Sequence, residues 1–459
     1  MKQLTPRIIA EVTEGEYIGD LSAQNIRVMG VARDNRDVTP CNLFICIRGK
    51  NVDGHSFANS AFSSGAACCL AEQLIPGANG PYIIVKSTLQ AAKALGAYYR
   101  SLFDIPIIGV TGSVGKTCAK ELIAAALGSK LNVLKTQGNL NNELGVPLTL
   151  LSLTERHEAA VVEMGINDFG EMSRLAEMVR PDIFVVTKIG YSHLEKLGDL
   201  DGVLRAKGEA FSYIKTDGVA ILNGDDELLW GCDPGVRKMT FGLGVRNDFR
   251  VEKIHAEGTS AVLCDIASAY GRFTARIPAY GVHLARMSAA AAAVGYLLGV
   301  RSDDISKGLL SYAPVGGRAN VADTGFITLI DDCYNANPDS VESALTSLAA
   351  LPNRKVAILG DMFELGAHSD KLHQNVGIFA ARTGIDSLIC CGDKAKSIFE
   401  GYGSANGKAA RYFRDKAELI VALPNLIEKS DAVLVKASRG MKFEEITGFL
   451  ATSTGPQPA

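Results

Sequence analysis

The segment TGSVGKT at 111–117 limits the possible folds most, because it stands between an apolar, β-branched run, IPIIGV (105–110), and a helix-like run, TCAKELIAAAL. A glycine-rich turn between a strand and a helix directs backbone N–H groups at an anion. Lys116 adds a positive charge, and the hydroxyl of Thr117 can hold Mg²⁺. The strict pattern has a glycine six residues before the lysine, where this chain has Val110. The flanking strand and helix nevertheless favour a nucleotide site over an ordinary glycine-rich turn. The predicted phosphate-binding residues are Thr111, Gly112, Ser113, Val114, Gly115, Lys116 and Thr117.

Composition narrows the class of protein. A chain of 459 residues is too long for one core and predicts about three domains. The balance of 47 basic and 50 acidic residues argues against a nucleic-acid partner. Ten cysteines without a CxxC pair indicate reduced thiols, and neither a signal-like N-terminus nor an apolar run of ~18 residues is present. We expect a cytoplasmic protein without membrane contact.

Hydrophobic periodicity divides the chain into three regions. Residues 1–103 hold short strand-like pieces and a closing helix, and predict a small N-terminal α/β domain. Residues 104–312 alternate strand and helix, which is typical of a parallel sheet with helices on both faces, and add an antiparallel patch at 247–279. After a glycine-rich hinge, APVGGRAN, residues 313–459 alternate again and predict a Rossmann-like domain with a disordered tail, STGPQPA.

Three side chains in the central region are candidates for catalysis or metal binding. Glu163 ends the apolar strand AAVVE, where ligands of open α/β sheets bind, so we favour a Mg²⁺ ligand shared with Thr117 over a solvent-facing acid. His193 lies in the loop after the next strand, and its imidazole suits either a metal or a structural role. Lys207 lies in a helical stretch, where an ordinary snorkelling lysine is the simpler interpretation.

Two asparagine-rich segments follow predicted strands, QGNLNNELGVP (137–147) and DDCYNANPDS (331–340). Asparagine and glycine suit plain turns, which is the alternative interpretation of both. They also place many hydrogen-bonding groups at the edge of the sheet where the phosphate loop lies.

The ordered motifs TGSVGKT, GNLNNELGVP, EMGINDFGEMSRL, RAKGEAF, NGDDE, GGR, YNANPDS and ILGDMFELG resemble those of the Mur ligases over nearly the whole chain. The resemblance implies that ATP phosphorylates the terminal carboxylate of a UDP-N-acetylmuramoyl tripeptide. The amine of D-alanyl-D-alanine then attacks the acyl phosphate, giving an amide, ADP and phosphate in peptidoglycan precursor synthesis. We expect the protein to be a monomer.

The same resemblance assigns roles to particular positions. Thr117 and Glu163 would hold one Mg²⁺, and His193 with carbamylated Lys207 would serve a second, so that Lys116, His193 and Lys207 are the implied catalytic residues. ATP would also contact His283, Arg318 and Asp332. The implied substrate contacts are Asn139, Asn141, Asn142, Tyr334, Asn335 and Asn337, with Asp34, Arg36, Asp53, Gly54 and His55 for the uridine nucleotide.

Some positions depart from the family pattern. Leu284 and Met287 replace two asparagines that usually contact adenine, Asn35 replaces a Ser or Thr, and Lys188 replaces an Asn. Two alternatives stay open beside the ligase. One is another amino-acid ligase of the superfamily, which shares the P-loop and the lysine, and the other is a non-catalytic nucleotide-binding module, which the replacements at 284 and 287 motivate. The pattern does not distinguish diaminopimelate from lysine in the tripeptide.

Overall fold

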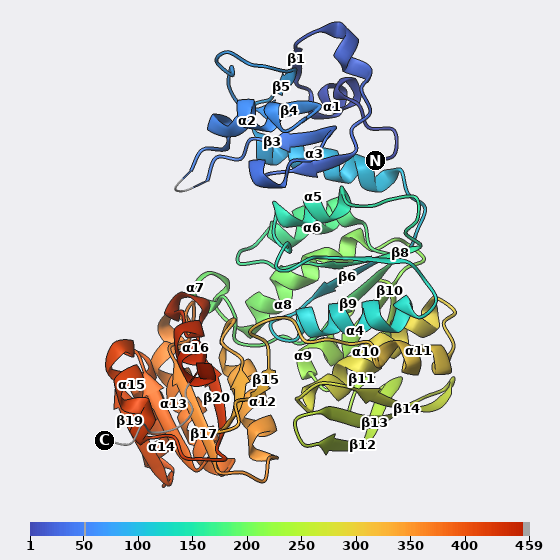
Figure 1. Cartoon of the computed structure of the whole chain (residues 1–459). Helices are drawn as coiled ribbons and strands as arrows, with labels where there is room; N and C mark the ends of the chain where they lie inside the picture. Colours follow the sequence, from blue (N-terminus) through green and yellow to red (C-terminus); the bar gives the residue numbers. More distant parts are fainter. Residues whose placement is uncertain (50–51, 453–459) are drawn as a thin grey trace.

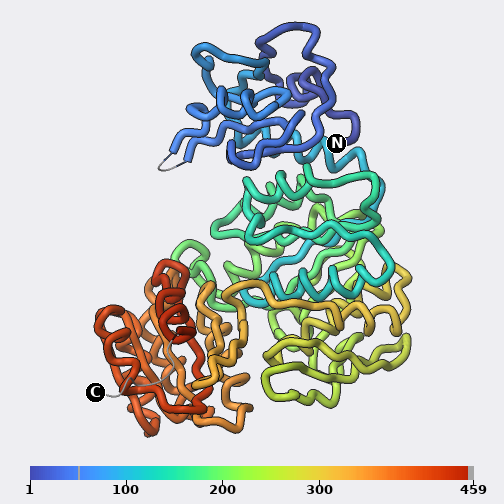
Figure 2. Tube along the Cα trace, in the orientation of Figure 1, coloured from blue at the N-terminus to red at the C-terminus, as the bar shows by residue number. Residues whose placement is uncertain are grey.

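The computed structural model describes residues 1–49 and 52–452 and contains three sheets in succession along the chain (Figure 1). The trace runs from the N-terminal sheet at one end through the central sheet, and the C-terminal sheet lies beside the central one (Figure 2). The predicted three-domain α/β architecture is therefore confirmed. The tail STGPQPA lies outside the described residues.

The N-terminal sheet has five strands in the order β1-β5-β4-β3-β2, of which only the β1–β5 pair is antiparallel. Its strands are β1 (Glu16–Ile18), β2 (Gly30–Ala32), β3 (Asn42–Ile45), β4 (Cys68–Ala71) and β5 (Tyr82–Ile84). Its helices are α1 (Pro6–Thr13), α2 (Ala58–Ser63) and α3 (Thr88–Ser101), and α3 packs against the central domain.

The central sheet has nine strands in the order β14-β13-β12-β11-β10-β9-β6-β8-β7. The strands from β7 to β11 are parallel, β12 joins β11 in parallel, and the β12–β14 patch is antiparallel as predicted. The bounds are β6 (Ile107–Thr111), β7 (Val133–Lys135), β8 (Ala159–Glu163), β9 (Ile183–Val186), β10 (Val219–Asn223), β11 (Arg237–Gly242), β12 (Phe249–Glu257), β13 (Ala261–Ser268) and β14 (Gly271–Ile277).

The helices of the central domain follow the predicted alternation of strand and helix. They are α4 (Lys116–Gly128), α5 (Gly145–Leu150), α6 (Glu171–Val179), α7 (Leu194–Leu197), α8 (Leu200–Gly208), α9 (Glu227–Gly231), α10 (His283–Leu297) and α11 (Ser302–Leu309). Helix α8 ends at Gly208, and the chain continues as a 3₁₀ turn over Glu209–Tyr213. There the carboxylate of Glu209 accepts hydrogen bonds from Gly170 N at 2.8 Å and Ser173 N at 3.1 Å, which satisfies the start of α6.

The C-terminal sheet has the order β15-β16-β20-β17-β18-β19, and only β15 is antiparallel to its neighbour. Its strands are β15 (Asn320–Asp323), β16 (Thr328–Asp331), β17 (Lys355–Gly360), β18 (Ser387–Cys391), β19 (Ala409–Phe413) and β20 (Ala432–Lys436). Its helices are α12 (Pro338–Ala349), α13 (Ser369–Arg382), α14 (Ala395–Ser404), α15 (Lys416–Ala422) and α16 (Glu444–Thr452).

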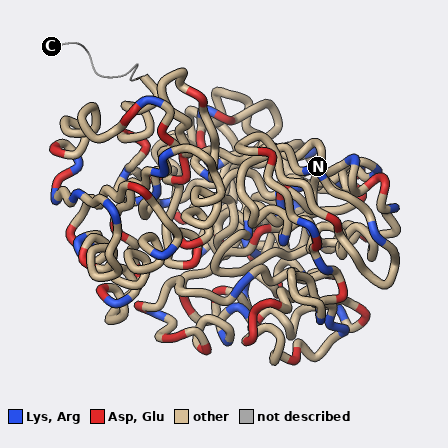
Figure 3. Tube along the Cα trace, turned by 90° about the horizontal axis from the view of Figure 1, so that it is seen from below, with Lys and Arg blue, Asp and Glu red and all other residues tan. Residues whose placement is uncertain are grey.

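The distribution of charge, the cysteines and the helix lengths agree with what the composition predicted. Basic and acidic residues alternate over the trace without a large patch of one sign (Figure 3). All ten cysteines are free thiols. Within the described ranges, no helix has both the length and the apolar character needed to cross a bilayer.

Helices α13 and α14 cross closely because each presents a glycine at the crossing. A Cβ atom on Gly377 would lie 2.0 Å from the carbonyl oxygen of Ile398, and one on Gly401 would lie 2.1 Å from that of Gln374. Gly403, in the same helix α14, has no atom within 4 Å of such a position.

We predict that Gly377→Ala destabilises the C-terminal domain by about 2 kcal/mol or more, since the helix backbones must move apart. Gly403→Ala is the matched control and should stabilise by about 0.5–1 kcal/mol, because alanine is the better helix former. Differential scanning calorimetry of the two variants tests this, and equal melting temperatures would contradict the close crossing of the two helices.

Candidate active site

The phosphate loop is folded by two close contacts with the end of β9. Gly112 has φ 142°, and a Cβ atom there would lie 2.0 Å from Thr187 Oγ1, so only glycine fits. The Thr187 hydroxyl lies 2.5 Å from Val114 O and 3.2 Å from Thr111 O. Ser113 N donates to Lys188 O at 2.8 Å. These contacts hold the loop in its turn before any ligand binds, and Thr187 was not among the predicted site residues.

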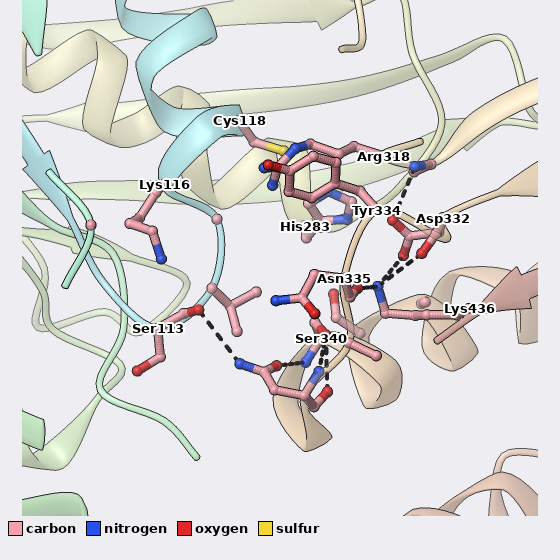
Figure 4. Close-up of a pocket in the computed structure, with 18 of the residues that line it drawn as sticks. Ser113, Lys116, Cys118, His283, Arg318, Asp332, Tyr334, Asn335, Ser340 and Lys436 are labelled. Atoms are coloured by element: carbon pink, nitrogen blue, oxygen red, sulfur yellow. Dashed lines mark hydrogen bonds and ion pairs between the residues drawn. The ribbon is translucent and has the colours of Figure 1, made fainter. Parts of the chain in front are cut away.

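Lys116 begins helix α4 directly after the loop (Figure 4). Its Nζ donates to the backbone oxygen of Gly112 at 2.6 Å, so the ammonium group is folded over the loop. Burial lowers the pKa of Lys116 below its usual value. An anion in the loop would therefore meet both a lysine and the free N–H groups of a helix start.

Glu163 is buried at the carboxyl end of β8, which excludes the solvent-facing alternative. Its carboxylate accepts from Thr117 Oγ1 at 3.0 Å and from Asn141 Nδ2 at 2.8 Å, and Lys120 Nζ lies 3.8 Å away. Between residues 1 and 452, with 50 and 51 aside, no three His, Cys, Asp or Glu side chains are grouped to hold a metal. The hydroxyl and carboxylate oxygens suit Mg²⁺ that is also held by phosphate oxygens.

Lys207 on α8 is only 1% exposed, which excludes the snorkelling alternative. Its Nζ forms no hydrogen bond or ion pair with any described residue. Burial first, and the charge of Lys116 second, hold the pKa of Lys207 well below its usual value. A buried amine whose pKa is lowered in this way is a better nucleophile and base than an exposed lysine.

His193 precedes α7 in a left-handed conformation, with φ 56°. Its Nδ1 atom lies 2.6 Å from Glu364 Oε2 of the C-terminal domain, and this contact lowers the pKa of Glu364 below its usual value. His193 therefore lies between the central domain and its neighbour.

The C-terminal domain contributes a charged wall to the same cavity (Figure 4). Lys436 at the end of β20 is buried, and its Nζ lies 2.7 Å from Asp332 Oδ2 and 3.0 Å from Asn335 O. The Arg318 guanidinium stacks over the Tyr334 ring at 4.0 Å from the ring centre. Lys436 is a second residue that was not predicted for the site, and the topology alone places its strand between β16 and β17.

The asparagine-rich segments divide into capping and cavity-facing side chains. Asn142 Oδ1 accepts a hydrogen bond from Gly145 N at 2.9 Å. This side chain therefore stabilises a turn, as the alternative interpretation of the segment predicted. Asn337 Oδ1 caps α12 through Ser340 N at 2.9 Å, while its Nδ2 approaches Ser113 O at 3.5 Å across the domain boundary. Asn335 Oδ1 accepts from Arg439 N at 3.3 Å.

A cavity of about 370 Å³ between the central and C-terminal domains joins most of the predicted residues. Those that line it are Ser113, Val114, Gly115, Lys116, Asn139, Asn141, Asn142, Glu163, His193, His283, Arg318, Asp332, Tyr334, Asn335 and Asn337. Thr111, Gly112, Thr117 and Lys207 are not among the lining residues. Thr117 contacts Glu163 in the wall, and Lys207 lies close enough to Lys116 for their charges to interact.

The predicted uridine-nucleotide residues lie in the N-terminal domain, apart from this cavity. Asp34 is the N-cap of a 3₁₀ turn, and hydrogen bonds from Arg36 hold the pKa of its carboxyl well below the usual value. Asp53 caps the turn that starts at Gly54. Both ring nitrogens of His55 are engaged, Nδ1 with Asp53 Oδ1 at 2.5 Å and Nε2 with Glu72 N at 2.8 Å.

The C-terminal domain docks beside the phosphate loop through Asp339, at the start of α12. Its carboxylate lies 2.5 Å from Lys188 Nζ and accepts from Tyr191 N at 2.9 Å. The same loop binds Ser113, whose Oγ donates to Gly190 O at 2.9 Å. Lys188, a departure from the usual asparagine, therefore pairs with the neighbouring domain rather than pointing freely at the phosphate site.

Three family models match this chain. The Mur ligase middle domain matches residues 110–295, the glutamate ligase domain of Mur ligases matches 317–439, and the catalytic domain of the Mur ligase family matches 27–125. Together these matches extend over most of the three sheets.

Individual proteins are similar over almost the full length. The UDP-N-acetylmuramoyl-tripeptide–D-alanyl-D-alanine ligase of Bacillus subtilis (strain 168) is 36% identical over 99% of each chain, and that of Escherichia coli (strain K12) is 37% identical over 94% of this chain and 96% of its own. The crystal structure of MurF from Acinetobacter baumannii superposes with a TM-score of 0.88 at 30% identity, over 98% of this chain and 99% of that one. MurF from Thermotoga maritima in complex with ADP superposes with a TM-score of 0.80 at 26% identity, over 92% of this chain and 97% of that one.

We predict that Asp339→Ala loosens the docking of the C-terminal domain by about 2 kcal/mol, because it removes a partly exposed ion pair with Lys188 and leaves Tyr191 N without its acceptor. Small-angle X-ray scattering should then show a larger radius of gyration than for the wild type. Asp370→Ala is the control, since its pair with Lys394 is exposed and lies within one domain. Equal scattering by Asp339→Ala and the wild type would contradict the docking role.

Proposed function

The chain belongs to the Mur ligase family, and from this premise we propose that it joins D-alanyl-D-alanine to a UDP-N-acetylmuramoyl tripeptide with hydrolysis of ATP to ADP. The observation that carries the proposal is full-length similarity to ligases of that name, combined with a cavity in which a phosphate loop faces a second domain.

The reaction needs a carboxylate to attack the terminal phosphorus of ATP. The bond between this phosphorus and the leaving oxygen of ADP breaks as the bond between the carboxylate oxygen and phosphorus forms. The products of this step are an acyl phosphate and ADP. The dipeptide amine attacks the acyl carbon, loses a proton, and expels inorganic phosphate from the tetrahedral intermediate. Lys116 and the N–H groups of the loop are placed to stabilise charge on the transferred group, and positioning of the two substrates supplies much of the remaining acceleration.

The residues at Glu163 fit a divalent cation of the nucleotide. Thr117 Oγ1 and the Glu163 carboxylate would hold Mg²⁺, which neutralises phosphate charge when bound. The lowered pKa of Lys207 favours attack of its Nζ on CO₂ with release of a proton, and the resulting carbamate would provide an anion close to Lys116. His193 would join that anion around a second Mg²⁺ once its contact with Glu364 opens.

The remaining assignments extend the same proposal. The N-terminal residues at 34, 36 and 53–55 would contact the uridine nucleotide, and the loop of Asn335 would face the dipeptide. Because ATP and a UDP-linked substrate are both required, we infer a cytoplasmic reaction. All the residues that line the cavity come from one chain, so we expect the monomer to be the active unit.

Two alternatives predict different behaviour. Another ligase of the superfamily would use the phosphate loop with a different amine, and a nucleotide-binding module would transfer no phosphate. The buried, unpaired Lys207 argues against the module, since an idle buried amine only costs stability.

Phosphate release with ATP, Mg²⁺, UDP-N-acetylmuramoyl tripeptide and D-alanyl-D-alanine, each omitted in turn, tests the function. We expect release only with the complete mixture. Release that ignores the dipeptide would indicate a different ligase, and no release in any mixture would indicate a binding module. Tripeptides ending in diaminopimelate or lysine, compared in parallel, would identify the preferred third residue.

We predict that Lys116→Ala lowers kcat by about 10³-fold or more while the melting temperature stays near that of the wild type, because the lost charge acts mainly on the transferred phosphoryl group. Lys130→Ala, at the opposite end of the same helical segment and exposed to solvent, is the control and should keep full activity. Near-normal turnover of Lys116→Ala would remove the loop from the mechanism.

We predict that Lys207→Ala is inactive and that a short-chain carboxylate such as acetate partly restores turnover by replacing the carbamate. The fold should not suffer from losing an unpaired buried amine, so Lys207→Met should melt at or above the wild-type temperature. Lys215→Ala, which removes a surface ion pair, is the control. Full activity of Lys207→Ala would exclude the carbamate role.

A further inference from the structure

Two polar atoms at the start of α10 are buried without a partner. Tyr280 OH and His283 Nδ1 form no hydrogen bond with any described residue, and both residues line the cavity of the proposed active site. Tyr280 is only 6% exposed. Since a buried hydroxyl that lacks a partner costs free energy, such an atom indicates a ligand that is absent from the free protein.

The surroundings of these atoms lack the amides usual in the family. Leu284 and Met287, on the first turns of α10, are buried in the apolar core of the central domain at 2% and 6% exposure. The Met287 sulfur is also the atom nearest to the position of a Cβ on Gly115, at 3.3 Å. The α10 side of the cavity therefore offers Tyr280 and His283 as its hydrogen-bonding groups in place of two asparagines.

The neighbours of Tyr280 and His283 in the cavity indicate which part of a bound nucleotide the two side chains would contact. Asn141 and Glu163 mark the end where the transferred phosphoryl group and Mg²⁺ would lie. Tyr280 and His283 line the same cavity next to Asp332, whose carboxylate is close enough to act on both. In Figure 4, His283 lies toward Tyr334 and Asp332 and away from Ser113 of the loop, so phosphates held by the loop would leave the nucleoside to extend toward this side of the cavity.

We propose that the Tyr280 hydroxyl, together with His283 Nδ1, hydrogen-bonds the nucleoside of bound ATP and so takes over the role that asparagines have at positions 284 and 287 in the usual family pattern. The proposal rests on the proposed function, since it assumes that the cavity binds ATP. It makes Tyr280 a specificity-determining residue that none of the family motifs contains.

The charge of the side chains at Tyr280 and His283 favours a nucleoside over a phosphate as their partner. Burial raises the pKa of Tyr280 above its usual value and lowers that of His283, so both side chains are neutral near pH 7. A neutral hydroxyl and a neutral imidazole are suited to ribose hydroxyls and to the nitrogens of a base. Phosphates are better bound by Lys116 and the loop.

Isothermal titration of Mg²⁺–ADP into the wild type and Tyr280→Phe tests the proposal. We expect binding to weaken by about fivefold, the value of one ordinary hydrogen bond. The melting temperature of the free variant should be equal or higher, because the hydroxyl has no partner to lose. If the hydroxyl has a structural role instead, Tyr280→Phe will melt at a lower temperature than the wild type and bind ADP with unchanged affinity. That result would overturn the proposal.

Tyr402→Phe, which removes a buried hydroxyl bonded to Ile385 O in the C-terminal domain, is the matched control and should bind ADP normally while melting lower. Titrations with 2′-deoxy-ADP and inosine diphosphate identify the contacted atom, because the analogue that lacks it should bind wild type and Tyr280→Phe equally. If the wild type binds ADP and Tyr280→Phe binds it equally well, this inference fails alone. If the wild type binds no nucleotide, the proposed function fails.

Discussion

The contact between Gly112 and Thr187 is the constraint on which the site depends. Strands β8, β6 and β9 are parallel neighbours, so their carboxyl ends meet at one edge of the central sheet. The loop after β6 passes so close to β9 that no side chain fits at Gly112. This close approach fixes the loop, brings Lys116 and Thr117 beside Glu163, and sets the 188–191 segment against the C-terminal domain.

Hydrogen bonding separates the structural lysines from the others. Lys120 donates to Thr136 O at 2.8 Å and pairs with Glu121, and Lys436 is held by Asp332 and Asn335. Lys207 has no such partner among the described residues and is nevertheless buried. Since a buried amine without a partner costs free energy, the burial of Lys207 agrees with the proposed carbamate, in which the side chain itself gains the anionic group.

The sequence predicts those parts of the molecule that local pattern determines. The phosphate loop, the strand of Glu163 and most central helices follow from residue spacing, and the structure agrees. Strands such as β1, β2 and β15 contain three or four residues, too few to show periodicity. The role of Lys436 depends on β20 lying between β16 and β17, and the burial of Lys207 depends on tertiary packing. Neither can be obtained from spacing.

The apolar residues at 284 and 287 have a consequence for the free protein. Helix α10 is alanine-rich and almost wholly buried, so an amide on its inner face would need a partner whenever the nucleotide is absent. Leucine and methionine remove that cost and pack in the core with Ala285. The unpaired hydrogen-bonding groups are then those of Tyr280, just before the helix, and of His283 at its start, and both residues line the cavity. On the proposed function, recognition of the nucleoside would then fall to the turn that contains Tyr280 and His283, while Leu284 and Met287 remain part of the apolar core.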